Sequence, residues 1–202
     1  MIVKICGIKT MEIAQIASDS GADLLGFVFA PSKRQITPKD AARIVQALPG
    51  SVLKVGVFVN ETAKHIVQIA DEVGLNIIQL HGEESPDILH TLGYPTIKAF
   101  PIDEITRTNV RNFPSDYLLV DSPKGKYHGG TGQPFNWNLV PHLAHEQDKL
   151  ILAGGLTPDN VKEAVRIVQP DGVDVSSGVE TNGEKDPLKI KQFIKNVKGC
   201  SN

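Results

Sequence analysis

The chain has 202 residues, of which 41% are hydrophobic and 5% aromatic, and its formal net charge at pH 7 is -2. This length is enough to bury a full core, and we expect one domain spanning residues 1–202. The small net charge and the scattered lysines argue against nucleic acid as a partner. No apolar run approaches the roughly 18 residues that cross a bilayer, and no signal peptide is evident, so we expect a cytoplasmic protein without a membrane partner.

Eight short runs rich in Val, Ile and Leu recur along the chain, each followed by a turn and a helical pattern. Their spacing is too long for β-hairpins and suits units in which a strand is followed by a helix that leads back to the next parallel strand. The runs cover residues 3–6, 24–29, 53–59, 75–81, 95–100, 117–121, 149–155 and 172–178.

Helix starts are marked by a capping residue followed by proline, because the side-chain oxygen accepts from free N–H groups and proline at the first helical position sacrifices no hydrogen bond. After the first such pair, and again after residue 60, apolar residues follow helical spacing, which predicts helices with one buried face. The four pairs are Thr37-Pro38, Ser85-Pro86, Thr157-Pro158 and Asp186-Pro187, with Thr10 and Asn60 as further candidate caps.

Strands that are apolar nearly throughout suit a parallel sheet covered by helices, and eight such units predict an α/β fold of the closed (β/α)8 TIM-barrel type. A doubly wound open sheet is the alternative. The turn after the first run, CGIKT, lacks the GxGxxG pattern of that fold. We favour the barrel, whose loops and helices must be short at this chain length.

One connection, residues 122–136, is long and glycine-rich with no periodicity. Such a loop in a compact domain is usually a lid or a binding loop, although a tolerated surface insertion is the alternative.

Barrel active sites form at the carboxyl ends of the strands, which draws attention to Cys6 and Asp121. Cys6 either fills space in the core or presents a thiol, and with only Cys200 as a second cysteine, a disulfide or structural metal is not expected. Asp121 ends an apolar run and either caps the next turn or serves a site. Together they could act as base and acid on one substrate.

The turns after the seventh and eighth runs predict a phosphate site, because barrels commonly hold phosphate there with backbone N–H groups. Each turn alone is a weak signal. The residues concerned are Gly154, Gly155, Ser176, Ser177 and Gly178.

Three further residues at strand ends are candidates for substrate binding. The planar fork of Arg34 suits a carboxylate, with a solvated loop charge as the alternative. His81 could bond to substrate or pack at the rim of the barrel. Asp174 shares the strand parity of Ser176, and it could orient a hydroxyl or be hydrogen-bonded inside the barrel.

The chain resembles the phosphoribosylanthranilate isomerases of tryptophan biosynthesis. The similarity runs its whole length and is carried in order by KICGI, PSKR, VGVFVN, QLHG, LLVDS, GGTGQPFNW, LAGGLTPDNV and VDVSSGVE. The resemblance implies an Amadori rearrangement of N-(5-phosphoribosyl)anthranilate to 1-(2-carboxyphenylamino)-1-deoxyribulose 5-phosphate without cofactor or metal. We expect a monomer or a homodimer.

By the same resemblance, Asp121 is the general acid on the furanose ring oxygen and Cys6 the base that takes the proton from C2. Arg34 would hold the anthranilate carboxylate, and the two glycine-containing turns the phosphate. Gly7 would keep the backbone beside Cys6 open to substrate, and nearby positive charge or helix N-termini would favour the thiolate.

Two alternatives remain at this point. One is another phosphate-binding barrel, such as a sugar-phosphate epimerase or a synthase of the same pathway, and epimerases of this kind are expected to show metal-binding histidines at strand ends. The other is a non-catalytic barrel-like or flavodoxin-like module, which would not need Cys6 and Asp121 together.

Overall fold

A computed structural model describes residues 1–105, 113, 115–123, 135–142 and 149–200. Its eight parallel strands close into a barrel, since each strand pairs with the next and β1 pairs with β8. The predicted (β/α)8 barrel is therefore confirmed, and the open sheet is wrong. The strands are β1 (Ile2–Cys6), β2 (Leu24–Val28), β3 (Leu53–Phe58), β4 (Ile77–Leu80), β5 (Thr96–Pro101), β6 (Tyr117–Asp121), β7 (Leu150–Leu152) and β8 (Gly172–Val175).

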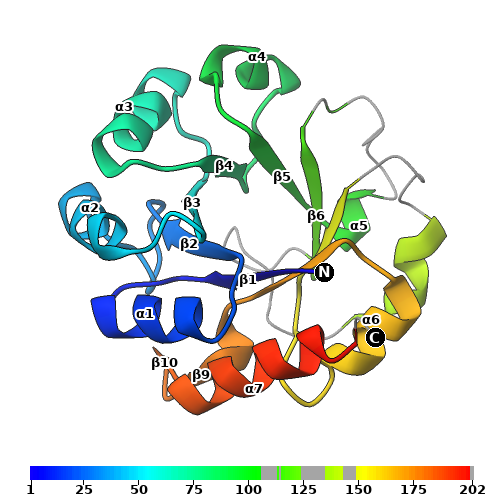
Figure 1. Ribbon diagram of the computed structural model, residues 1–202. Coiled ribbons are helices and arrows are strands. Elements are labelled where there is room, and N and C mark those ends of the chain that lie inside the picture. Colours follow the sequence, from blue (N-terminus) through cyan, green and yellow to red (C-terminus); the bar gives the residue numbers. More distant parts are fainter. Residues whose placement is uncertain (106–112, 114, 124–134, 143–148, 201–202) are drawn as a thin grey trace.

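Helices surround the barrel, and the ring they form is visible in Figure 1. Two of the α-helices, α4 and α5, have only four residues each. The α-helices are α1 (Met11–Asp19), α2 (Pro38–Ala47), α3 (Ala63–Val73), α4 (Leu89–Leu92), α5 (Ile102–Ile105), α6 (Val161–Val168) and α7 (Pro187–Lys198). Three 3-10 helices, η1 (Pro86–Ile88), η3 (Trp137–His142) and η4 (Ser177–Val179), and a hairpin of β9 (Glu180–Thr181) and β10 (Glu184–Lys185) complete the described elements.

Four of the six predicted caps are confirmed: Thr10, Thr37, Ser85 and Asp186 each accept from backbone N–H groups at a helix start. Asn60 is wrong, because it adopts a left-handed conformation with φ of 53°, and Thr62 caps α3 instead. Thr157 is also wrong, because the chain makes a turn after it and α6 begins only at Val161. Both errors place the cap a few residues too early.

The core has two parts, one on each face of the sheet. The larger part lies between the sheet and the helices, and it buries the apolar stripes predicted for α2 and α3: Ala41, Ile44, Val45, Leu48, Ile66, Ile69, Ala70 and Val73. The smaller part fills the barrel itself with Leu24, Val55, Ile77, Ile97, Ala99, Leu119, Ile151 and Ala153. Alternate residues of each strand therefore point into the barrel.

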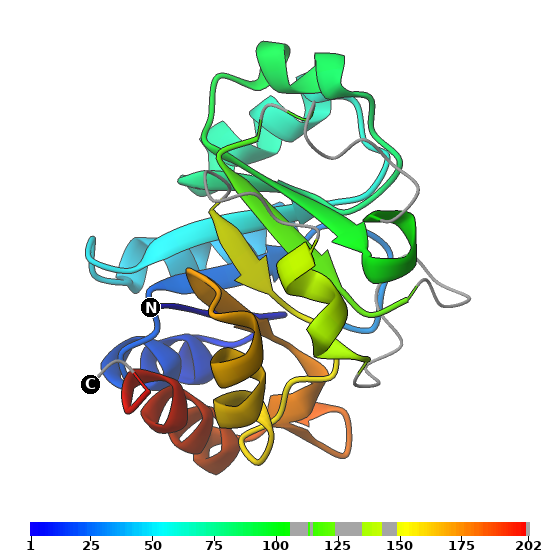
Figure 2. The same ribbon diagram turned by 90° about the vertical axis from the view of Figure 1, so that its right-hand side faces the viewer.

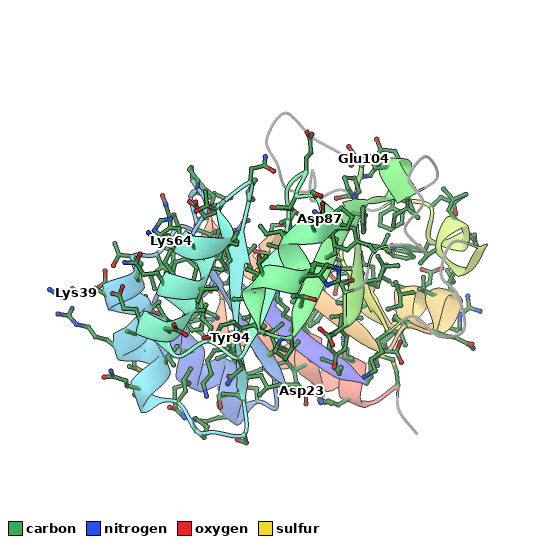
Figure 3. All side chains as sticks on the ribbon, turned by 90° about the horizontal axis from the view of Figure 1, so that it is seen from above. Asp23, Lys39, Lys64, Asp87, Tyr94 and Glu104 are labelled. Carbon is green, nitrogen blue, oxygen red and sulfur yellow. The ribbon has the colours of Figure 1, made fainter. Side chains whose placement is uncertain are left out.

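The two ends of the barrel are distinct. In Figure 2 both chain termini lie at the end where the strands begin, and the strands run from there toward the side that carries α5 and the β9–β10 hairpin. Figure 3 shows Asp23 at the first end and Glu104 at the other, with Lys39 and Lys64 pointing outward from α2 and α3. In the part of the chain that is described, no helix combines the length and apolar character needed to span a membrane.

The glycine-rich connection predicted as a lid falls mostly on residues 124–134, which lie outside the described residues.

Candidate active site

A pocket of about 390 Å³ opens at the carboxyl ends of the strands. All ten residues that the sequence singled out line it: Cys6, Arg34, His81, Asp121, Gly154, Gly155, Asp174, Ser176, Ser177 and Gly178. Strand parity explains the convergence, because the inward positions near each strand end form the floor and wall of the pocket. Apolar side chains from the same positions, Val28, Val57 and Ala153, complete the wall.

Cys6 is the last residue of β1, and its thiol is free and buried. Burial raises the pKa of Cys6, and the Asp174 carboxylate raises it further, whereas Lys4 and Lys185 act in the opposite direction. The positive charge expected from the sequence is therefore present, but burial outweighs it in the free protein. The resting side chain is a neutral thiol in this geometry.

Lys4 lies beneath Cys6 in the barrel interior, with its ammonium 2.9 Å from the Asp174 Oδ2 atom. Burial lowers the pKa of Lys4, but Asp174 and Cys6 outweigh burial and raise it above its usual range. Lys4 was not predicted from the sequence, and it places a buried cation next to the thiol.

Asp121 ends β6 and is held on both carboxylate oxygens. The Ser122 backbone N–H donates to Oδ1 over 2.7 Å, and His81 Nε2 lies 3.3 Å from Oδ2. The Gln79 amide nitrogen lies 2.9 Å from His81 Nδ1. With the amide donating, His81 Nδ1 is the acceptor and Nε2 carries the hydrogen that faces Asp121. His81 therefore fixes the orientation of Asp121, a role that the sequence did not indicate.

Arg34 is held by a residue outside the predicted set. Its Nε and Nη2 atoms donate to Glu180 over 2.6 and 3.0 Å, and Glu180 also accepts from Lys185 over 2.8 Å. Burial raises the pKa of Glu180, but the hydrogen bonds from Arg34 and Lys185 outweigh it and lower the pKa to about 2. The solvated-charge alternative for Arg34 is wrong.

Gly7 differs from its predicted role. A side chain there would place its Cβ 2.6 Å from Arg34 Cδ, and the residue has φ of 83°. The absent side chain makes room for the stem of Arg34, which packs over the backbone next to Cys6.

The two turns expected to bind phosphate lie against each other. Gly154 and Gly155 have φ of 81° and 64°, and a Cβ on Gly178 would stand 1.8 Å from the Leu156 carbonyl oxygen. The close approach of the two turns therefore requires glycine at residue 178. Ser176 is already bonded, because its hydroxyl donates to the Cys6 carbonyl oxygen over 3.1 Å.

Four pocket-region residues escaped the sequence analysis: Lys4, Gln79, Glu180 and Lys185. Parity could have found the first two, since Lys4 precedes Cys6 by two residues and Gln79 precedes His81 by two. Glu180 ends the VDVSSGVE motif, but the sequence indicated no role for it or for Lys185, and both residues belong to the hairpin after β8. Within the described ranges, no cluster of three His, Cys, Asp or Glu side chains could hold a metal ion.

A closed parallel barrel with a thiol, a fixed carboxylate and an arginine fork in one pocket at the strand ends defines a (β/α)8-barrel enzyme. Comparison with known proteins identifies which kind. The family profile described as N-(5'-phosphoribosyl)anthranilate (PRA) isomerase matches residues 3–196. The chain belongs to this family, and the resemblance read from its motifs is confirmed.

Individual relatives agree with this assignment. The N-(5'-phosphoribosyl)anthranilate isomerase of Bacillus cereus (strain Q1) is 53% identical over 203 residues, covering 100% of both chains. The crystal structure of phosphoribosyl anthranilate isomerase from Thermotoga maritima is 45% identical with a TM-score of 0.90, covering 98% of this chain and 100% of that chain. A structure of the isomerase in complex with reduced 1-(o-carboxyphenylamino)-1-deoxyribulose 5-phosphate is 43% identical with a TM-score of 0.85, covering 98% of this chain and 100% of that one.

Proposed function

We propose that this chain converts N-(5'-phosphoribosyl)anthranilate to 1-(2-carboxyphenylamino)-1-deoxyribulose 5-phosphate, a step of tryptophan biosynthesis, with Cys6 as base and Asp121 as acid. The observation that carries the proposal is the placement of both groups in one pocket between an arginine fork and two glycine-containing turns. The ligand named for the related structure, reduced 1-(o-carboxyphenylamino)-1-deoxyribulose 5-phosphate, carries a carboxylate, which suits the arginine, and a phosphate, which suits the two turns.

The reaction moves protons without any net oxidation. In the reactive form the proton resides on Asp121 and Cys6 is a thiolate, which has the same total number of protons as a carboxylate with a thiol. The proton of the Asp121 carboxyl passes to the furanose ring oxygen, the bond from that oxygen to C1 breaks, and C1 becomes a Schiff base with the anthranilate nitrogen. The Cys6 thiolate then removes the proton from C2, and the electron pair of that bond forms an enolamine. Tautomerisation of the enolamine gives the ketone at C2.

The pocket geometry supports these roles. Asp121 is held by Ser122 and His81, so its carboxyl group has a defined direction before substrate binds. Cys6 projects from the end of β1, a rigid element, rather than from a loop. The two groups belong to strands separated by β7 and β8 around the barrel, so a substrate lying across the pocket can contact both.

Binding groups are distributed around this pair. Glu180 occupies the Nε side of the Arg34 guanidinium and leaves the Nη1 end as the donor edge for a substrate carboxylate. The backbone at Gly154, Gly155, Ser177 and Gly178 supplies the phosphate site. His81 and Asp174 line the same pocket as these anchors.

The activity test generates the unstable substrate in place from anthranilate and phosphoribosyl pyrophosphate with a separate transferase. Turnover is followed by fluorescence, and the product is identified by mass and by its conversion to indoleglycerol phosphate. Cys6→Ala and Asp121→Asn should each lower turnover by orders of magnitude, whereas Cys200→Ala should not. A folded Cys6→Ala protein with near-normal turnover would refute the assignment of the base.

A further inference from the structure

Lys4 is a charged residue in a place where barrels usually carry apolar side chains. It lies on the inward face of β1, its side chain is 0% exposed, and its partner Asp174 is 8% exposed. Burying two charges is costly even when they are paired, and apolar residues of similar volume often replace such a pair without loss of stability. Stability alone therefore does not account for a lysine at this position.

The position of Lys4 relative to Cys6 is set by the strand. The two residues are two apart on β1, so they share the inward face. Gly26 on β2 is the register partner of Cys6, and a Cβ built there would lie 2.8 Å from Cys6 Sγ and 3.2 Å from Lys4 Nζ. The sulfur and the ammonium thus share the space that the missing side chain leaves.

We propose that Lys4 is a positioning residue whose ammonium, held by Asp174, stabilises the Cys6 thiolate and so determines how much of the base is available. This inference rests on the proposed function, in which Cys6 removes the C2 proton. Lys4 does not touch the reacting atoms and acts through Cys6.

The charges around Cys6 support this assignment. Lys4 on β1 and Lys185 on β10 favour the thiolate, and Asp174 on β8 opposes it. Lys4 acts more strongly than Lys185 on the thiol, and its contact with Asp174 keeps it protonated. The Lys185 ammonium is shared among Glu180 and the Ser176 carbonyl and hydroxyl oxygens. Lys4 is therefore the cation best placed to respond when the thiol ionises.

The test measures the thiol directly, without substrate. In a Cys200→Ala background, the rate of Cys6 alkylation by iodoacetamide is recorded from pH 7 to 10, because only the thiolate reacts. Lys4→Met should slow alkylation at pH 8 by about tenfold or more, which corresponds to a rise of about one unit in the thiol pKa. Lys98→Met is the matched control: it removes a buried lysine bonded to Glu84 at 2.6 Å, and Lys98 does not line the pocket.

A folded Lys4→Met protein whose alkylation profile matches that of the parent would overturn the proposal. If Lys4→Met does not fold, the double variant Lys4→Met/Asp174→Asn replaces the buried pair by neutral groups of similar size. Its alkylation should also be slower than that of the parent, because the Lys4 ammonium shares the space beside Gly26 with the sulfur, whereas Asp174 contacts the ammonium. An equal or faster rate in the double variant would refute the inference.

Turnover separates this inference from the proposed function. In Lys4→Met, the pH at which kcat/KM reaches half its maximum should rise together with the alkylation midpoint. If Lys4→Met is alkylated more slowly than the parent but the parent has no isomerase turnover, the Lys4 inference stands and the proposed function is refuted. If Lys4→Met is alkylated at the parent's rate while the parent's turnover depends on Cys6, the proposed function stands and the Lys4 inference is refuted.

Discussion

Glu180 links the stability of the fold to pH through its contacts with Arg34 and Lys185. Its pKa is about 2 in the folded protein against 4.5 for an ordinary glutamate. At about 1.36 kcal/mol per unit this difference corresponds to about 3.4 kcal/mol, which solvent screening of this partly buried group reduces to about 2 kcal/mol. Because the folded pKa is depressed, this stabilisation is fully present above about pH 4.5 and is lost as the pH falls toward 2.

The perturbation is Glu180→Gln, which keeps the shape and removes the charge. Urea unfolding of both proteins at pH 7 should give a free energy of unfolding about 2 kcal/mol lower for the variant. The difference in free energy of unfolding between the two proteins should fall to about half near pH 3, which is about midway between pH 4.5 and pH 2. Glu184→Gln, in the same hairpin but with a side chain 76% exposed, is the control and should show little change.

A difference that stays constant from pH 7 to pH 3 would refute the reasoning, because it would show that the charge of Glu180 does not carry the stabilisation. An equally large effect in Glu184→Gln would attribute it to the charge of the hairpin as a whole.

Two other substitutions test particular contacts. Gly26→Ala should slow Cys6 alkylation and turnover and lower the free energy of unfolding by about 1–3 kcal/mol, because the new methyl group enters the space of the sulfur and the Lys4 ammonium. Gly50→Ala, where a Cβ meets nothing within 4 Å, is the control in the unfolding and activity assays. Thr62→Ala removes the cap of α3 and should lower the free energy of unfolding by about 1 kcal/mol with turnover retained. Thr157→Ala is the control, because it should not lose a capping bond. Equal decreases in the free energy of unfolding of the two variants, measured in urea, would contradict the observed caps.

The sequence was most informative where a single physical rule dominates. The apolar runs predicted every barrel strand, because a strand covered by helices on one face and packed inside a barrel on the other must be apolar throughout. Caps were predictable where proline follows directly in a regular helix, as at Thr37, but not at Thr157, where a turn intervenes before α6.

The site was predictable to the extent that strand ends define it. Cys6 and Asp121 were found because they end strands, and the pocket contains both. Glu180 was missed because its relation to Arg34 joins residues 146 positions apart, and no local pattern encodes that contact. The interpretation of Gly7 was also wrong, because the side chain that would collide with a Cβ there comes from the next βα loop.

The positions of the chain termini allow the order of the barrel strands in the sequence to be changed while the active-site residues stay in place. The Lys198 ammonium lies 3.3 Å from the Met1 carbonyl oxygen, so the start of β1 and the end of α7 lie close together, at the face opposite the pocket. A short linker could join them, and new ends could be opened at Gly50, an exposed turn between α2 and β3. Because every loop that follows a strand would stay intact, a circular permutant should keep its active site.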